Sequence, residues 1–395
     1  MKLQLTKDKT IDLAMPWEKS PAAGPTRRGK GPSEVVGILL GDDDPRGCPA
    51  VRLQRRKDGV VVKALGFLPP PGALPKAWEE LKRETAWELA PQFQAPQAAL
   101  AACSGEQFIR QTTVDALSGE LKLLSPLAAT PKKKLGVRRS EDTGKIEKAA
   151  VMPEDKPQPF VPVSRNGLRS VMGPLAEEPF VLQTGLPEYQ VLWLSRLLPE
   201  GRRPTACSVQ TAPAALLSAL WSQPAFQAAD GTAVAVFVQR RSIYFAAYRE
   251  GELVLFRECP GGIGSVAIHE QVRISLGVDD AIVDSFLEEG LVDPTPVLEP
   301  IMRPVLQQLQ LSLDYLAQRH DVHVEHVFLL GLPSGAAFWS AFAKETIGLP
   351  FISPGVFEGL SLAEKGGVPA ELASPVASQA FLAAYGAACA AMEVA

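Results

Sequence analysis

The chain has 395 residues, enough for two or three packed units, and its 46% hydrophobic and 21% charged residues are ordinary for a globular protein. Its 40 basic and 44 acidic residues give a net charge of −4, which argues against a nucleic-acid partner. The five cysteines share no CxxC spacing, which indicates reduced thiols in a cytoplasmic protein. The longest uncharged apolar stretch, 380–392, is shorter than the roughly 20 residues of a membrane span.

Residues 1–33 are predicted to be a flexible tail, because prolines and a basic run leave few apolar residues to bury. Four apolar residues alternate within this segment: Ile11, Leu13, Met15 and Trp17. An extended peptide would place all four on one side, and an exposed tryptophan with apolar neighbours is typical of a peptide anchor. One hypothesis is that this segment docks into a groove of the protein or of an assembly partner. The alternative is an unstructured tail.

Order is expected to begin at residue 33. The continuous apolar run 35–40 predicts a buried strand, and 51–55 alternates as a half-buried strand would. Asp58 and Gly59 form a hairpin turn signal before a further strand at 60–65. Three antiparallel strands therefore open the first unit.

The middle of the chain mixes weak signals with a segment of a different kind. A helix is predicted at 77–89 and strands near 108–114 and 121–124. Residues 128–163 are rich in proline and carry basic runs, which predicts a flexible insertion. A solvated loop is the expected state of its basic run, and attraction to anionic lipid is the alternative.

From residue 180 onward the pattern is that of alternating helices and strands. The long helix at 297–320 has the clearest signal, because its apolar residues recur at three- and four-residue spacing. The predicted strands lie at 181–183, 206–209, 232–239, 242–248, 253–257 and 327–330, and the predicted helices at 188–198, 213–221, 265–276, 297–320, 336–344 and 378–393.

The ordered series of segments from 206 to the end resembles the PilM family of actin-like proteins. The segments that carry the resemblance are 208–220, 251–257 with Gly261 and Gly262, 297–315, 328–335 and 381–388. About half of the chain matches well, and 76–200 matches only in layout. The resemblance implies an α/β, two-lobed actin-like fold with an intermediate small α+β subdomain.

The implied domain division follows this layout. The tail is 1–33, and the first lobe comprises 34–75, 201–230 and a closing helix within 366–395. The second lobe is 231–365, and the intermediate subdomain is 76–200 with a disordered insertion at 128–163.

The resemblance also implies a nucleotide site formed by two hairpins and a third loop. The two hairpins usually carry Asp-x-Gly elements, and here Leu39 and Val238 occupy the aspartate positions. Mg²⁺ needs hard oxygen ligands, so ATP hydrolysis is not expected. The residues of this degenerate site are Gly41, Asp42, Gln239, Arg240, Gly331, Ser334 and Gly335. No cofactor is required, and weak ATP or ADP binding, with Arg240 or Arg241 attracting a phosphate, is the alternative.

Other groups of polar residues carry less chemistry. His320, His323 and His326 have the spacing of a metal cluster, but no zinc-site pattern accompanies them, and surface histidines near a helix end are expected. The glycine-rich segment 261–264 lacks the lysine of a P-loop and predicts the sharp start of a helix. No catalytic residue and no metal site are predicted.

The function implied by the resemblance is that of an adaptor. PilM-like proteins are cytoplasmic, peripheral to the inner membrane, and hold the N-terminus of the bitopic membrane protein PilN, linking it to pilus motor components. Three alternatives stay open: an active actin-like ATPase of the pilus or cell-division type, the cytoplasmic module of a type II secretion protein, and an unrelated anion-binding or regulatory protein. The type II module is normally followed by a membrane helix, and this chain ends at Ala395 without one.

Overall fold

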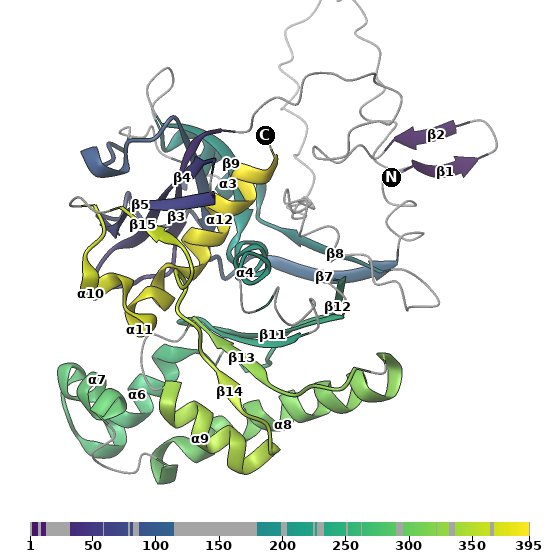
Figure 1. Ribbon diagram of the computed structural model, residues 1–395, viewed down its shortest axis with the longest axis vertical. Helices are drawn as coiled ribbons and strands as arrows, with labels where there is room; N and C mark the ends of the chain where they lie inside the picture. The colour runs from purple at the N-terminus through teal and green to yellow at the C-terminus, as the bar shows by residue number, and fades with distance from the viewer. Residues whose placement is uncertain are drawn as a thin grey trace, which may run out of the picture.

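Two β-sheets, one in each lobe, organise the chain (Figure 1). The first contains six strands in the order β15-β5-β4-β3-β6-β9, and the second five strands in the order β12-β11-β10-β13-β14. The computed structural model describes residues 2–6, 9–12, 32–57, 59–77, 80–81, 87–113, 180–198, 204–223, 226, 233–249, 252–261, 263–289, 295–320, 322–331, 336–363 and 367–394.

The six-stranded sheet begins with the predicted three antiparallel strands, which the structure confirms. The next strands run parallel, with β6 between β3 and β9, and β15 along β5. The strand bounds are β3 (Glu34–Leu40), β4 (Cys48–Arg56), β5 (Gly59–Leu68), β6 (Gln97–Ala102), β9 (Thr205–Thr211) and β15 (Ser361–Leu362).

The five-stranded sheet is built on the predicted hairpin strands. β10, β11 and β12 pair antiparallel in sequence order, whereas β13 lies parallel to β10 on its other side and β14 parallel to β13. The bounds are β10 (Ala233–Val238), β11 (Ile243–Arg249), β12 (Glu252–Glu258), β13 (Val327–Leu330) and β14 (Phe351–Ile352).

The helices follow the apolar periodicity closely. The predicted helices from 188 onward are confirmed within a few residues, and α7 is an addition that the sequence pattern did not indicate. The predicted helix at 77–89 lies partly outside the described residues, and its end is wrong, because 87–90 is not helical. The helices are α3 (Glu188–Arg196), α4 (Ala212–Trp221), α6 (Ser265–Leu276), α7 (Asp280–Glu289), α8 (Thr295–His320), α9 (Ala336–Ile347), α10 (Ala370–Ala373), α11 (Pro375–Ser378) and α12 (Leu382–Val394), with 3₁₀ turns η2 (Pro91–Phe93) and η3 (Gln379–Phe381).

Helices α4 and α12 lie between the two sheets and share one apolar core with both. α12 approaches β3 so closely that a Cβ on Gly37 would lie 1.9 Å from the Ala384 carbonyl oxygen. A Cβ on Gly386 would lie 1.9 Å from the carbonyl oxygen of Ala215 in α4. The small side chains of this alanine- and glycine-rich helix therefore allow its close approach to both neighbours.

The outer faces of the sheets are covered by other helices. Helices α6, α8 and α9 cover the five-stranded sheet, and α3 with the turn η2 covers the six-stranded one (Figure 1). Within the described residues, the segment Pro375–Met392 is apolar enough to span a membrane, but 78% of it is buried. Its place in the shared core accounts for its apolar composition.

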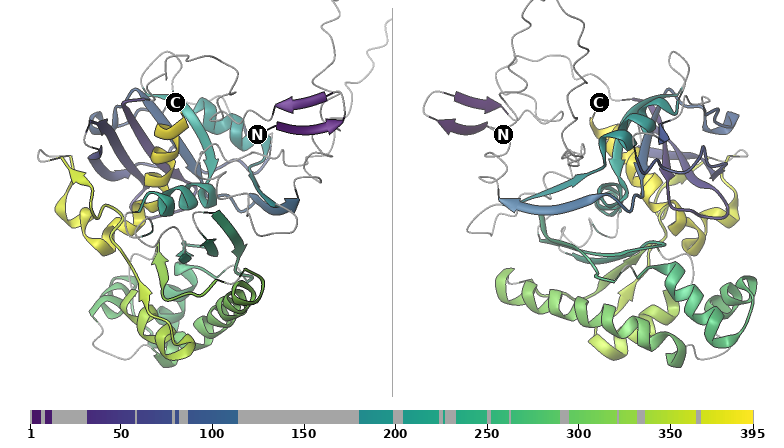
Figure 2. Two further views of the ribbon diagram at one scale, coloured as in Figure 1. Left: turned by 45° about the vertical axis from the view of Figure 1, so that its right-hand side comes forward. Right: turned by 180° about the vertical axis from the view of Figure 1, so that it is seen from behind.

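A separate antiparallel ribbon, β7 (Phe108–Thr113) with β8 (Phe180–Gly185), lies beside β9 (Figure 2). The predicted intermediate range 76–200 is too broad, because β6 lies within it and pairs inside the six-stranded sheet. Likewise β15 falls in the predicted second lobe, 231–365, but pairs with β5. The sequence pattern did not predict the pairing of β6 or of β15, because strand pairing depends on contacts between residues distant in sequence.

The N-terminal segment contains a hairpin that the predicted tail did not include. β1 (Lys2–Thr6) pairs antiparallel with β2 (Lys9–Asp12), and Ile11 belongs to β2. The other residues of the predicted docking segment, Leu13, Met15 and Trp17, lie outside the described residues, as do the predicted strand at 121–124 and the predicted insertion at 128–163.

We expect Gly386→Ala to destabilise the protein, although alanine normally favours a helix over glycine by about 1 kcal/mol. The added methyl group would collide with the α4 backbone, and overpacking of this kind costs about 1–3 kcal/mol. Thermal unfolding should show a melting temperature several degrees lower. The control is Gly105→Ala, because a Cβ at Gly105 meets nothing within 4 Å. Equal melting temperatures for the two variants would contradict the packing argument.

Candidate functional site

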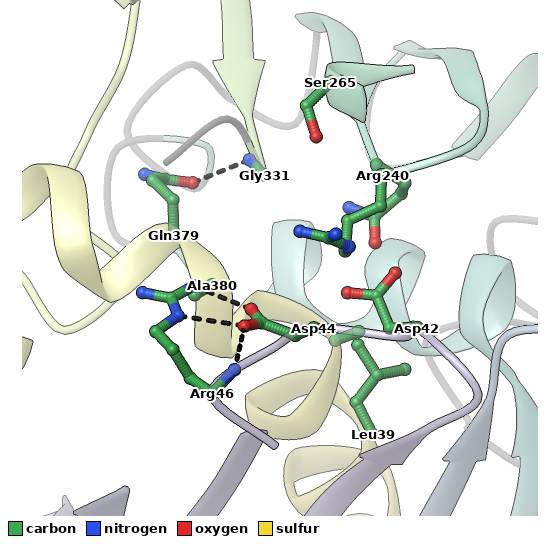
Figure 3. A pocket seen from close by; sticks show the side chains of 11 residues that line it. Leu39, Asp42, Asp44, Arg46, Arg240, Ser265, Gly331, Gln379 and Ala380 are labelled. Atoms are coloured by element: carbon green, nitrogen blue, oxygen red, sulfur yellow. Dashed lines mark hydrogen bonds and ion pairs between the residues drawn. The ribbon is translucent and has the colours of Figure 1, made fainter. Parts of the chain in front are cut away.

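The candidate site is a cleft between the lobes, where three chain connections meet (Figure 3). The β3–β4 loop contributes from the first lobe, and the β10–β11 turn and the end of β13 contribute from the second. The start of α6 and the segment that leads into α12 complete the wall. The lining residues are Leu39, Asp42, Asp44, Arg46, Gln239, Arg240, Ser265, Gly331, Gln379, Ala380 and Ala383.

The structure brings together most of the predicted site residues. Asp42, Gln239, Arg240 and Gly331 all line the cleft. Gly41 immediately precedes Asp42 at a φ of 76°, and a Cβ there would lie 2.5 Å from the Cys103 carbonyl oxygen, so glycine is required. The remaining two predicted residues, Ser334 and Gly335, lie outside the described residues.

Apolar side chains stand at the two positions where the resemblance expects aspartate. Leu39, at the end of β3, has 2% of its surface exposed and lines the floor of the cleft. Val238, at the end of β10, is fully buried in the core beneath the five-stranded sheet. Neither position supplies an oxygen ligand to the cleft.

The β10–β11 turn is fixed by hydrogen bonds to the start of α6. Backbone N–H groups of Ser265 and Val266 donate to the carbonyl oxygens of Gln239 and Arg240, at 2.9 and 3.0 Å. Gly264 permits this contact, because a Cβ there would lie 2.4 Å from the Arg240 carbonyl oxygen. The predicted helix start after 261–264 is confirmed. The carbonyl groups of the turn accept hydrogen bonds from N–H groups at the start of α6, which in other proteins can bind anions.

Arg46 reaches into the cleft and pairs with an acid of its own loop. Its Nη2 and Nε donate to the two Asp44 carboxylate oxygens at 2.7 and 3.0 Å, and its guanidinium lies 4.4 Å from the centre of the Phe67 ring. Burial opposes ionisation of Asp44, but the hydrogen bonds from Arg46 outweigh it and lower the pKa of this carboxyl. The sequence analysis missed Arg46, since a proline-containing turn gives no sign of where its arginine points.

Gln379, in the segment before α12, forms hydrogen bonds that hold the end of β13 in place. Its Oε1 accepts a hydrogen bond from the Gly331 N–H at 2.8 Å, and its Nε2 donates to the Pro354 carbonyl oxygen at 2.5 Å. The side chain is 2% exposed, so both bonds are largely shielded from water. Sequence reasoning missed Gln379 as well, because its partners lie 25 and 48 residues away.

Asp42 faces Arg240 across the cleft (Figure 3). Burial raises the pKa of its carboxyl to about 7, and the positive charge of Arg240 only partly opposes this. Among the described residues, its Oδ1 is one of the buried side-chain atoms without a hydrogen-bond partner, and so is Nε of Arg240. The two groups attract each other without completing their hydrogen bonds.

The cleft is small in this structure. It leaves about 30 Å³ for the centres of water molecules, enough for a few waters and far less than a nucleotide needs. Among the described residues no group of three histidine, cysteine or acidic side chains could hold a metal ion. Of the predicted histidine group, His326 packs edge-on against Phe328 with 5.1 Å between ring centres.

We expect Gln379→Met to destabilise the protein by about 1–3 kcal/mol, because a buried N–H or carbonyl group left without its partner costs about that much. Methionine has a similar length, so packing changes little. Urea unfolding should show the loss as a lower midpoint. The matched control is Gln310→Met on the exposed face of α8, which should change stability by less than about 0.5 kcal/mol. A loss of equal size in both variants would show that the buried hydrogen bonds of Gln379 add nothing.

No protein-family model matches the chain, and no curated protein matches it. Among solved structures, a chain of the PilM-PilN type IV pilus biogenesis complex is similar at 14% identity and a TM-score of 0.58, over 91% of this chain and 98% of that chain.

Two further structures are more distant. A Bacteroides thetaiotaomicron protein with an actin-like ATPase fold and unknown function has 10% identity and a TM-score of 0.38, over 82% of this chain and 91% of that chain. The ethanolamine utilization protein EutJ from Carboxydothermus hydrogenoformans has 11% identity and a TM-score of 0.37, over 91% and 90%. The likeness to the pilus complex confirms the predicted fold: the chain has the two-lobed actin-like fold, in an arrangement similar to that of the chain in the PilM-PilN complex.

Proposed function

We propose that the chain is an adaptor of a type IV pilus assembly machine and does not hydrolyse ATP. The observation that carries the pilus assignment is the likeness to a chain of the PilM-PilN complex over 91% of this chain and 98% of that one. A match over nearly the full length of both chains must span both lobes, so the shared feature is a whole arrangement rather than one lobe.

The chemistry of the cleft supports the absence of turnover. Phosphoryl transfer needs Mg²⁺ and a positioned water, and Mg²⁺ needs oxygen ligands. Leu39 and Val238 offer none. Asp44 is engaged by Arg46, and the raised pKa of Asp42 leaves it partly protonated at neutral pH, which weakens it as a metal ligand. No cofactor is required for an adaptor, and weak ATP or ADP binding through the cleft arginines stays within the proposal.

The proposed partner is the cytoplasmic N-terminus of a PilN-like bitopic membrane protein. It is taken from the name of the complex that the chain resembles. Through that partner the chain would sit at the cytoplasmic face of the inner membrane and connect to pilus motor components. The tail residues Ile11, Leu13, Met15 and Trp17 remain a second predicted contact, either with the protein itself or with an assembly partner.

Purified protein with ATP and Mg²⁺ should show no steady-state hydrolysis above background, because the cleft lacks metal ligands. Phosphate release is the measurement, and enzyme-like turnover on the order of 1 s⁻¹ would overturn the proposal. If such turnover appeared, Asp42→Ala would show whether Asp42 replaces the lost aspartates. Asp314→Ala on α8 is the matched control, since Asp314 is exposed and does not line the cleft.

Affinity purification of the tagged chain from cross-linked native membranes should recover a bitopic pilus-assembly protein. Mass spectrometry identifies the partner, and competition with a synthetic peptide of its cytoplasmic N-terminus tests whether that segment makes the contact. Recovery of type II secretion components alone would favour the alternative assignment. Recovery of neither class, with the tagged chain folded and abundant, would count against the adaptor proposal.

A further inference from the structure

The mouth of the cleft is formed by two short connections that face each other from different lobes. The β3–β4 loop carries Asp42, Asp43 and Asp44, and the β10–β11 turn carries Arg240 and Arg241. Opposite charges therefore meet across the mouth. Three acidic residues on one loop repel one another, and this repulsion falls when one of them is paired with an arginine or protonated.

Two of the three acids have an arginine of their own. Asp44 is held by the bidentate contact from Arg46 within the loop, and Asp43 forms an ion pair with Arg241 across the mouth. The Asp43–Arg241 pair is well exposed, at 62% and 68%, so it adds little to closure. This ion pair is present in the closed arrangement but is too weak to stabilise that arrangement by itself.

Asp42 is in a different position. Both Arg240 and Arg241 act on its charge, Arg240 the more strongly, and its Oδ1 accepts no hydrogen bond from either. Buried unpaired atoms remain on both sides, at Asp42 Oδ1 and Arg240 Nε. A buried carboxylate in this state is costly, whereas a protonated carboxyl is not. The charged and titratable groups facing it are Asp43 and Asp44 on its own loop, Arg240 and Arg241 on the opposite turn, Cys48 on β4 and Cys103 after β6.

We infer that the mouth of the cleft is a proton-dependent latch, in which the β3–β4 loop closes against the β10–β11 turn when Asp42 takes up a proton from solvent and opens when Asp42 releases it. The motion is local, because the apolar core shared by the two sheets with α4 and α12 holds the lobes together below the mouth. The latch is a property of the isolated chain, so its failure would leave the proposed pilus role untouched.

The direction of the pH dependence follows from linkage. In the closed cleft the pKa of Asp42 is about 7, and in an open, hydrated mouth it would return towards 3.8. The closed form therefore binds a proton that the open form releases. Between pH of about 4 and about 7, the ratio of closed to open forms should fall by up to tenfold per pH unit as pH rises. Above about 7 the carboxyl is ionised in both forms, and the dependence should end.

Hydrogen exchange measured by mass spectrometry between pH 5 and 8 tests the latch. After correction for the intrinsic pH dependence of exchange, amides of residues 41–47 and 239–242 should lose protection as pH rises towards 7 and then level off. Asp42→Asn mimics the protonated carboxyl and should stay protected across the range. Asp43→Asn is the matched control: it removes the neighbouring charge, asparagine tolerates the φ of 52° at this position, and the pH dependence should persist.

Flat protection in the unchanged protein, or the same pH dependence in Asp42→Asn, would overturn the latch. If Asp42→Asn does not fold, carbon-13 NMR of the aspartate carboxyl groups in the unchanged protein decides the matter. The Asp42 carboxyl should titrate with a midpoint above its ordinary value of 3.8 but below about 7, because the open form binds the proton more weakly than the closed form, and an ordinary midpoint for Asp42 would contradict the inference.

Discussion

The backbone contacts of α12 with β3 and α4 are the constraint on which the rest of the structure depends. At Gly37 and Gly386 there is no space for a side chain, because a carbonyl oxygen of the neighbouring element lies 1.9 Å from the position of a Cβ. The other α12 side chains in the shared core are mainly alanines, together with Leu382, Tyr385, Cys389 and Met392. Such close packing permits one depth and one rotation of the helix, so the last segment of the chain fixes α12 and α4 against the six-stranded sheet.

The cleft inherits its geometry from this packing. Gln379 lies one short turn before α12, and its position there lets it reach both Gly331 and Pro354. On the other side, β3 leads from its contact with α12 directly into Leu39 and the β3–β4 loop. Gln379 and the β3–β4 loop are distant in sequence. They meet at the cleft because Gln379 directly precedes α12 and β3 packs against the same helix.

Local pattern predicted the hairpins and the long helix α8 well, because period and turn residues are local signals. It missed β6, whose sequence QAALAA lacks the β-branched and aromatic residues that usually mark a strand. β6 is a strand because β3 and β9 pair with it on both sides. At the site, Asp42 and Arg240 could be predicted from the resemblance, whereas Arg46 and Gln379 could not, since their roles depend on contacts made only in the folded chain.

The polar groups of the cleft are used mainly for contacts within the protein. Arg46 satisfies Asp44, Gln379 satisfies Gly331 and Pro354, and the turn carbonyls of Gln239 and Arg240 cap α6. A cleft arranged for phosphate would instead keep donors free for the ligand. Asp42 and Arg240 are the exception, since both keep a buried atom without a partner. An incomplete polar contact between the β3–β4 loop and the β10–β11 turn holds these two connections together less well than a completed one, so the gain or loss of one proton there changes that contact directly.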